Sequence, residues 1–178
     1  MSLILYKKEI MLRDGRELIV KEAEEIEAIE LIKYVSVIRR ESKFLAIDTS
    51  GYKINILDVK KYIKACRESD MQALLIGWVQ NEIVGHLALR SCIWQRMRHT
   101  GEVIISVSKK NWGIGIGPLI LDALLDWAQK TKVIKKVKLR VQSDNDRAIA
   151  VYNKLGFLKE RSIAWGFFDH LVMGRRLD

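Results

Sequence analysis

The sequence predicts a mixed α/β fold whose sheet contains antiparallel pairs. Segments with helical spacing of apolar residues lie between short β-branched runs, which is typical of α/β proteins. Residues 73–92 indicate two strands joined by a turn at 80–82, and this β-hairpin argues against a purely parallel, doubly wound sheet. Residues 159–167 and 171–176 indicate a second antiparallel pair at the end of the chain.

The N-terminal part is expected to form one strand and two helices. Residues 17–21 predict the strand, and residues 24–39 and 57–67 predict the helices. The expected apolar face of the first helix comprises Ile26, Ile29, Val35 and Ile38.

The elements that follow alternate between strands and helices. They are expected as strands at 73–79, 83–92, 102–108 and 136–141 and helices at 116–130 and 144–155. Gly156 stands where a glycine commonly ends a helix. The helix at 116–130 is amphipathic, with an expected apolar face of Ile116, Ile120, Leu124, Trp127 and Ala128.

Length and composition favour a single domain over residues 1–178. The apolar start at 2–6 is too short for a signal peptide, and no apolar run approaches the roughly 20 residues that cross a bilayer. Cys66 and Cys92 have neither metal-ligand spacing nor a disulfide framework. We therefore expect a cytoplasmic protein with reduced thiols, no metal and no membrane partner.

The positive charge is concentrated in the second part of the chain. Residues 1–70 carry 14 basic and 13 acidic side chains, whereas residues 71–178 carry 17 and 9. Such an excess attracts nucleic acid or a polyanionic small molecule, or it simply solvates the surface. Because zinc-knuckle, helix-turn-helix and RNA-binding aromatic motifs are all missing from the sequence, we expect no nucleic-acid partner.

A glycine-rich segment, Asn111-Trp112-Gly113-Ile114-Gly115-Ile116-Gly117, lies between an expected strand and an expected helix. Glycine lets a ligand approach the main chain closely, and the first helical turn offers free N–H groups at the positive end of the helix dipole. This segment therefore predicts a bound phosphate, although a glycine-rich turn without a ligand is the alternative.

Two common phosphate-binding loops do not fit this spacing. A P-loop needs Lys and then Ser or Thr after its last glycine, but Gly117 is followed by Pro118 and Leu119. A dinucleotide fingerprint needs Gly-x-Gly-x-x-Gly, and neither the pattern from Gly113 nor that from Gly115 supplies the last glycine.

Two motifs resemble the signatures of the GNAT superfamily of N-acyltransferases. Residues 107–117 resemble its acetyl-CoA loop, and residues 141–157 resemble its strand–Asn–x–Arg–Ala–helix–Tyr–x–Lys–x–Gly–Phe signature. The motifs occur in the family's order, and the resemblance covers about residues 17–176.

The resemblance implies the details of the fold and the reaction. It implies a mixed, mostly antiparallel central sheet flanked by about four helices. The sheet would splay open between strands ending near Val107 and Val141, and acetyl-CoA would bind in the gap. A primary amine, on a small molecule, a protein N-terminus or a lysine, would attack the thioester directly. A catalytically silent acyl-CoA-binding sensor is the alternative, and a basic nucleic-acid-binding module is the less favoured one.

The resemblance also implies roles for individual residues. Glu102 is the candidate base, with a solvated carboxylate as the alternative and His99 and His86 as rivals. Tyr152 matches the family tyrosine that protonates the leaving thiolate, and Asn145 matches the asparagine that contacts the cofactor arm. The expected cofactor-binding residues are Ile105, Ser106, Val107, Trp112, Gly113, Ile114, Gly115, Ile116, Gly117, Asn145, Tyr152 and Lys154.

Two positions depart from the family pattern. Trp112 replaces the usual Gln or Arg, and Pro118 removes one N–H from the helix start. Phosphate binding is therefore expected to depend on the backbone of Gly113 to Gly117, helped by Lys109 and Lys110.

The acceptor and the oligomeric state stay open at this point. The resemblance places the acceptor walls at the first helices and the closing strands, which gives Tyr34, Phe44, Trp165, Phe167, Phe168 and Asp169. A homodimer is one of the open oligomeric states.

Overall fold

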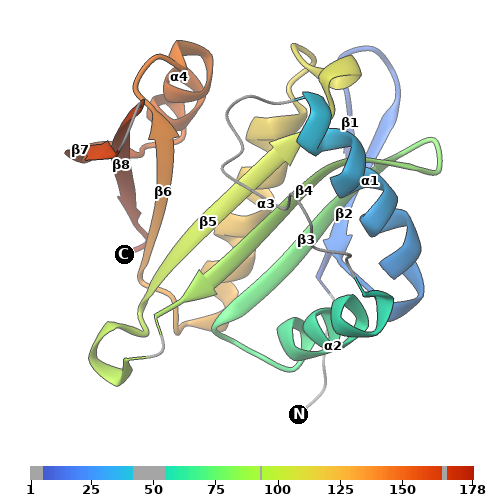
Figure 1. Cartoon of the computed structure of the whole chain (residues 1–178), viewed down its shortest axis with the longest axis horizontal. Coiled ribbons are helices and arrows are strands. Elements are labelled where there is room, and N and C mark those ends of the chain that lie inside the picture. The colour runs from blue at the N-terminus through green and yellow to red at the C-terminus, as the bar shows by residue number, and fades with distance from the viewer. Residues whose placement is uncertain (1–5, 42–54, 93, 166–167) are drawn as a thin grey trace.

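The computed structural model describes residues 6–41, 55–92, 94–165 and 168–178. In these residues the strands are β1 (Lys7–Met11), β2 (Glu17–Glu22), β3 (Gln72–Val79), β4 (Glu82–Ser91), β5 (Thr100–Val107), β6 (Lys136–Gln142), β7 (Leu158–Trp165) and β8 (Phe168–Arg176). They form one 8-stranded sheet in the order β1-β2-β3-β4-β5-β6-β8-β7 (Figure 1). Among these neighbours only β5 and β6 are parallel, so the predicted mixed, mostly antiparallel sheet is confirmed.

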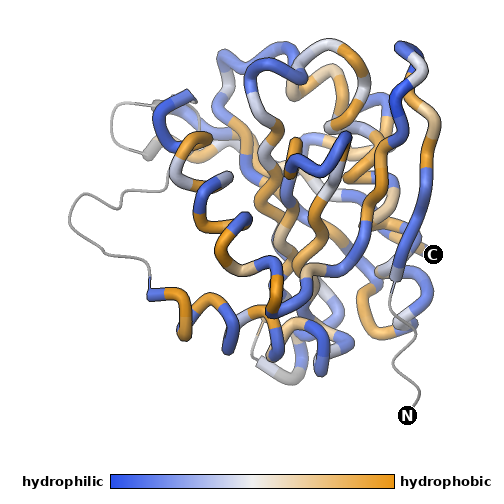
Figure 2. The backbone as a smooth tube through the Cα atoms, turned by 90° about the vertical axis from the view of Figure 1, so that its right-hand side faces the viewer, coloured by the Kyte–Doolittle hydropathy of each residue, from blue (hydrophilic) through white to orange (hydrophobic). Residues whose placement is uncertain are grey.

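The helices of the described residues are α1 (Ala28–Glu41), α2 (Ile56–Arg67), α3 (Ile116–Thr131) and α4 (Asp146–Lys154). The buried side chains of α1 and α2 pack against β3 and β4 on one face of the sheet. Those of α3 and α4 belong to the larger core on the opposite face. The strands in the middle of the molecule are mainly apolar, while the helices alternate between apolar and polar residues (Figure 2).

Most predicted elements are present, and two details of the N-terminal part are corrected. Strand β1 was not predicted, because its Lys-Lys-Glu-Ile-Met sequence has few apolar residues and lies at the sheet edge. In α1 the predicted apolar face is wrong for Ile26 and Ile29, which are 82% and 49% exposed. Helix α1 begins only at Ala28, and the buried side chains are Ala28, Leu31, Tyr34 and Ile38.

Local signals elsewhere in the chain were interpreted correctly. Gln80 and Asn81 have positive φ angles of 49° and 64°, which suit the tight turn of the β3–β4 hairpin. The predicted apolar face of α3 is buried. Gly156, with φ 77°, follows α4, and the Phe157 N–H donates to the Tyr152 carbonyl at 2.9 Å, as in a Schellman motif.

The sheet opens between its two parallel strands. Strand β5 pairs with β6 only from Thr100 to Val103, opposite Lys136 to Leu139, although β5 continues to Val107 and β6 to Gln142. Beyond Val103 the β6-facing edge of β5 has no partner strand among the described residues. The predicted splay is therefore confirmed, and it positions the functional site.

Candidate active site

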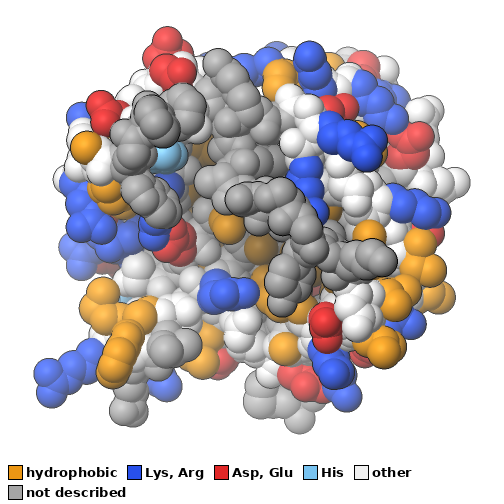
Figure 3. Space-filling view, in the orientation of Figure 1, with side chains coloured by type: hydrophobic (Ala, Val, Ile, Leu, Met, Phe, Trp, Pro, Cys, Tyr) orange, Lys and Arg blue, Asp and Glu red, His pale blue; other side chains and the backbone are white. Residues whose placement is uncertain are grey.

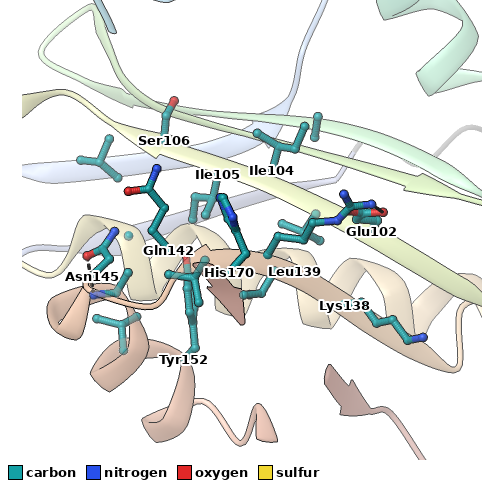
Figure 4. A pocket seen from close by; sticks show the side chains of 18 of the residues that line it. Glu102, Ile104, Ile105, Ser106, Lys138, Leu139, Gln142, Asn145, Tyr152 and His170 are labelled. Atoms are coloured by element: carbon teal, nitrogen blue, oxygen red, sulfur yellow. Dashed lines mark hydrogen bonds and ion pairs between the residues drawn. The ribbon is translucent and has the colours of Figure 1, made fainter. Parts of the chain in front are cut away.

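A cavity of about 1360 Å³ occupies the gap between β5 and β6 and extends along the α2 side of the sheet. Its walls come from β4, β5, β6, the start of α3 and α4, with Tyr152 rising from α4 toward the gap (Figure 4). Most of the predicted site residues line it: Glu102, Ile105, Ser106, Val107, Trp112, Gly113, Gly115, Ile116, Gly117, Asn145 and Tyr152.

Along the open edge of β5, backbone groups point alternately toward β4 and toward the gap. The Ser108 N–H donates to the Val84 carbonyl at 2.9 Å, and the Cys92 N–H donates to the Thr100 carbonyl at 3.3 Å. Since the β4–β5 register runs unbroken between these two bonds, even-numbered residues of β5 bond to β4. The N–H groups of Ile105 and Val107 therefore face the gap.

The glycine-rich loop presents unpaired N–H groups to the same cavity. Gly113 and Gly115 have φ angles of 89° and 91°, a left-handed conformation that glycine adopts without strain. Among the described residues, no acceptor takes the backbone N–H groups from Gly113 to Gly117. Because Gly115 is also the N-cap of the 16-residue helix α3, these donors converge at the positive end of a helix dipole. This arrangement suits a phosphate group.

Gly117 directly precedes Pro118 in the first turn of α3. A Cβ on the residue before a proline clashes with the proline ring in the helical conformation, so Pro118 favours glycine at this position. Outside the neighbouring residues, an added Cβ would meet Val107 Cγ2 at an ordinary contact distance of 3.7 Å. The missing side chain also leaves the backbone open to a close ligand, which suits a CoA pyrophosphate at the loop.

Trp112 fills the position where a glutamine or arginine is expected, and it does so without donating to the cavity. Its indole Nε1 donates to the Val107 carbonyl at 2.8 Å, which occupies one acceptor on the open edge of β5. The Arg147 guanidinium, at the start of α4, lies 5.6 Å from the centre of the Trp112 ring. Arg147 thereby brings a cation to the phosphate loop.

Tyr152 is buried on α4, and its hydroxyl has no hydrogen-bond partner in the described part of the chain. Burial raises the pKa of Tyr152 to about 12. The phenol is therefore protonated at neutral pH and able to donate into the cavity.

Asn145 caps the helix that carries Tyr152. Its Oδ1 accepts a hydrogen bond from the Ala148 N–H at 3.2 Å, so the side chain fixes the start of α4. The Nδ2 group is not used in this cap, and Asn145 lines the cavity. The capping and ligand-binding roles are compatible.

Glu102 lies on β5 with its side chain 50% exposed and paired with Arg140 of β6, where Nε and Oε1 are 2.7 Å apart. It lines the cavity (Figure 4). His99, one of its rivals, is exposed and lines a separate pocket beside Lys135.

His86, the other rival, faces the opposite end of β5. Its Nδ1 lies 2.8 Å from Ser106 Oγ, which in turn lies 3.1 Å from the Tyr34 hydroxyl. Burial lowers the pKa of His86 to about 4, so the ring is neutral at neutral pH. Ser106 lines the cavity and connects it to this buried pair.

Several predicted residues lie away from the cavity lining. Ile114 packs against the core, and Lys154 is exposed near the end of α4. The Lys109 N–H donates to Glu41, and the Lys110 amine pairs with Glu82. Of the predicted acceptor walls, Tyr34 is buried and Asp169 is exposed. Phe44, Phe167 and the side chains of Trp165 and Phe168 lie outside the described residues.

Sequence reasoning missed a group of polar residues on one face of the sheet. Its members that line the cavity are Arg90, Lys138, Arg140, Gln142, Arg161 and His170. The alternation of basic and apolar residues in Lys136-Val137-Lys138-Leu139-Arg140-Val141 was a usable signal, because it predicts a strand with one basic face.

The splayed mixed sheet and the glycine-rich loop at the start of α3 point to one class of protein, the acyl-group transferases. A family model described as "Acetyltransferase (GNAT) family" matches residues 39–157, which is more than half of the chain. The chain therefore belongs to the GNAT family of acetyltransferases, as the two motifs predicted.

Solved structures share this fold over nearly the whole chain. A GNAT-family acetyltransferase from Streptococcus pneumoniae is 29% identical, with a TM-score of 0.85, and the match covers 89% of this chain and 98% of that one. The putative acetyltransferase yncA from Salmonella typhimurium, solved with acetyl-CoA, is 17% identical, with a TM-score of 0.77 and coverages of 90% and 94%. A ribosomal-protein-alanine N-acetyltransferase from Brucella melitensis is 19% identical, with a TM-score of 0.73 and coverages of 88% and 98%. The comparison with curated proteins gives no match.

Two further features bear on the site's chemistry. In the described ranges, no group of three or more His, Cys, Asp or Glu side chains is arranged to hold a metal ion. None of the helices described is both long and apolar enough to span a bilayer.

Proposed function

We propose that this protein transfers the acetyl group of acetyl-CoA directly to a primary amine, on a small molecule, a protein N-terminus or a lysine. The observation that carries the proposal is the unpaired edge of β5, which faces Tyr152 and ends at a loop of unpaired N–H groups. One ligand with a pyrophosphate, an amide-containing arm and a thioester uses all three features.

The backbone supplies binding and charge stabilisation in this proposal. The N–H groups from Gly113 to Gly117 bind the pyrophosphate, with Arg147 beside them. The N–H groups of Ile105 and Val107 face the arm and the thioester carbonyl. A donor at that carbonyl stabilises the oxyanion that forms when the amine attacks.

Side chains move the protons. An alkylammonium with a pKa near 10 is no nucleophile at neutral pH, so the acceptor must first lose a proton. Glu102 takes this proton through water, and its ion pair with Arg140 holds the carboxylate in position at the cavity wall. Tyr152 donates its proton to the leaving thiolate, and Asn145 donates from its Nδ2 group to the cofactor arm.

The proposal also covers the domain organisation, the location and the partners of the protein. The chain acts as one cytoplasmic acetyltransferase domain over residues 1–178, without nucleic-acid or membrane partners, and it acts as a monomer or a homodimer. Ribosomal-protein-alanine acetyltransferases among the solved relatives support a protein acceptor as one candidate class.

The test combines calorimetry with an acetyl-CoA consumption assay over a panel of amines. We expect binding of acetyl-CoA at micromolar to millimolar concentration and turnover with at least one amine. Absence of binding would overturn the proposal. Binding without turnover across the panel would favour the acyl-CoA-binding sensor.

A further inference from the structure

Charged side chains gather on the sheet face that forms the far wall of the cavity. Arg90 of β4 pairs in register with Glu102 of β5, which pairs with Lys138 of β6. Arg140 of β6 and Arg161 of β7 both pair with Val172 of β8. Because residues opposite one another in neighbouring strands share a face, all of these charged residues lie on the same face. They all line the cavity.

The acids on this face leave basic side chains unmatched. Glu102 pairs with Arg140, and Glu160 pairs with Lys138 at 3.7 Å. Within the described chain, Arg90 and Arg161 have no carboxylate partner. Figure 3 shows blue Lys and Arg side chains gathered on the side of the view where β6 and β8 lie.

Arg90 is held in a defined place, although no carboxylate of the described residues pairs with it. Its guanidinium carbon lies 5.9 Å from the centre of the Tyr62 ring, which projects from α2. Tyr62 also lines the cavity. The contact with Tyr62 positions the guanidinium, and its remaining N–H groups are available to bind a carboxylate.

We propose that the acceptor is an anionic amine, whose carboxylate binds Arg90 while its amino group lies beside Glu102. This inference rests on the proposed function, because it concerns the acceptor of the same reaction. Arg90 is directly opposite Glu102 in the neighbouring strand, where Cβ atoms are about 5 Å apart. In an acceptor that reaches both side chains, the carboxylate and the amino group are therefore separated by only a few bonds. A free amino acid and a peptide with an acidic first residue both carry this chemistry.

The experiment measures kcat/KM for matched acceptors that differ in one carboxylate. Glutamine against glutamine amide tests the free amino acid, and amidated peptides beginning with Glu or Gln test the peptide. We expect a preference of at least about tenfold for the carboxylate form in one arm, as for a charge-assisted hydrogen bond. Equal rates within both pairs would overturn the inference.

Variants of Arg90 test whether this residue causes the preference for acceptors with a carboxylate. Arg90→Gln should reduce the ratio to below about threefold, while Arg90→Lys, which keeps the charge but loses the fork, should retain part of it. Arg13→Gln removes a matched charge from an exposed position in the β1–β2 turn and should leave the ratio unchanged. An unchanged ratio in Arg90→Gln would also overturn the inference.

A second measurement does not depend on turnover of an anionic amine. Succinate should compete with a neutral acceptor amine in the wild type, and Arg90→Gln should raise its inhibition constant about tenfold. Succinamide is the uncharged control. If acetyl-CoA itself fails to bind, the proposed function fails; if it binds and reacts without a carboxylate preference, only this inference fails.

Discussion

The Tyr152 hydroxyl is buried, protonated at neutral pH and without a hydrogen-bond partner among the described residues. Tyr152→Phe removes only the hydroxyl. We expect kcat to fall by about 10²-fold, as for the loss of a general acid, while the Kd for CoA changes less than about twofold. Steady-state kinetics and calorimetry check this, and an unchanged kcat would remove the proton-donor role.

Glu102 is the residue proposed to remove the proton from the acceptor ammonium group. In Glu102→Gln we expect kcat/KM for the amine to fall by about 10²-fold and the acidic limb of the pH profile to change. His99→Asn is the control, since His99 lies outside the cavity lining. A wild-type profile in Glu102→Gln would redirect the search to His86.

His86 makes stability depend on pH. Burial lowers its pKa from 6.5 to about 4, so the unfolded chain binds a proton more readily than the folded chain in this range. The stabilisation is complete above pH 6.5 and is lost as the pH falls toward 4, by at most about 3 kcal/mol. Melting temperatures of wild type and His86→Gln between these pH values check this: the wild-type curve should be steeper, and parallel curves would contradict it.

Single residues were predictable where a motif names them and not where only register brings them together. Asn145 and Tyr152 were found because helix capping and the family signature fix their spacing. Arg90, Arg140 and Arg161 lie on three strands, and their neighbourhood depends on cross-strand pairing that no local pattern encodes.

The first turn of helix α3 contains Gly117 directly before Pro118. Gly117→Ala should weaken CoA binding roughly tenfold, because the methyl group lies where a ligand approaches the N–H groups. It should also destabilise the free protein, because a Cβ before a proline clashes with the proline ring in the helical conformation. Calorimetry and denaturation measure the two effects.

Gly115, at the same helix start, is required by its backbone conformation. With φ 91°, its replacement by alanine should destabilise the free protein by about 1 kcal/mol. An unchanged Kd for CoA in Gly117→Ala would contradict close approach of a ligand to this backbone.

Elements were predictable in proportion to the strength of their apolar pattern. The β3–β4 hairpin and α3 have long apolar faces and were located within about two residues. Strand β1 is short and charged, and it forms because Glu22 accepts a hydrogen bond from the Tyr6 N–H at 2.9 Å and because β2 offers a free edge. Contacts of this kind join residues that are distant in the sequence, so a short stretch of sequence does not reveal them.

At the scale of the whole molecule, the sheet is two antiparallel units joined by one short parallel ladder. The first unit runs from β1 to β5, and the second comprises β6, β8 and β7. Alternation of strands and helices predicted the fold class, and the resemblance predicted the splay. The basic face arises only when both units align, so the sequence did not reveal it.

The open edge of β5 should be visible in the hydrogen–deuterium exchange rates of its backbone amides. Within the part of the chain that the structure describes, the amides of Ile105 and Val107 have no acceptor strand, whereas those of Ile104 and Ser106 bond to β4. Hydrogen–deuterium exchange should therefore alternate between fast and slow from one residue to the next along β5. Acetyl-CoA should slow only the fast positions, and uniform exchange along β5 would contradict the assigned register.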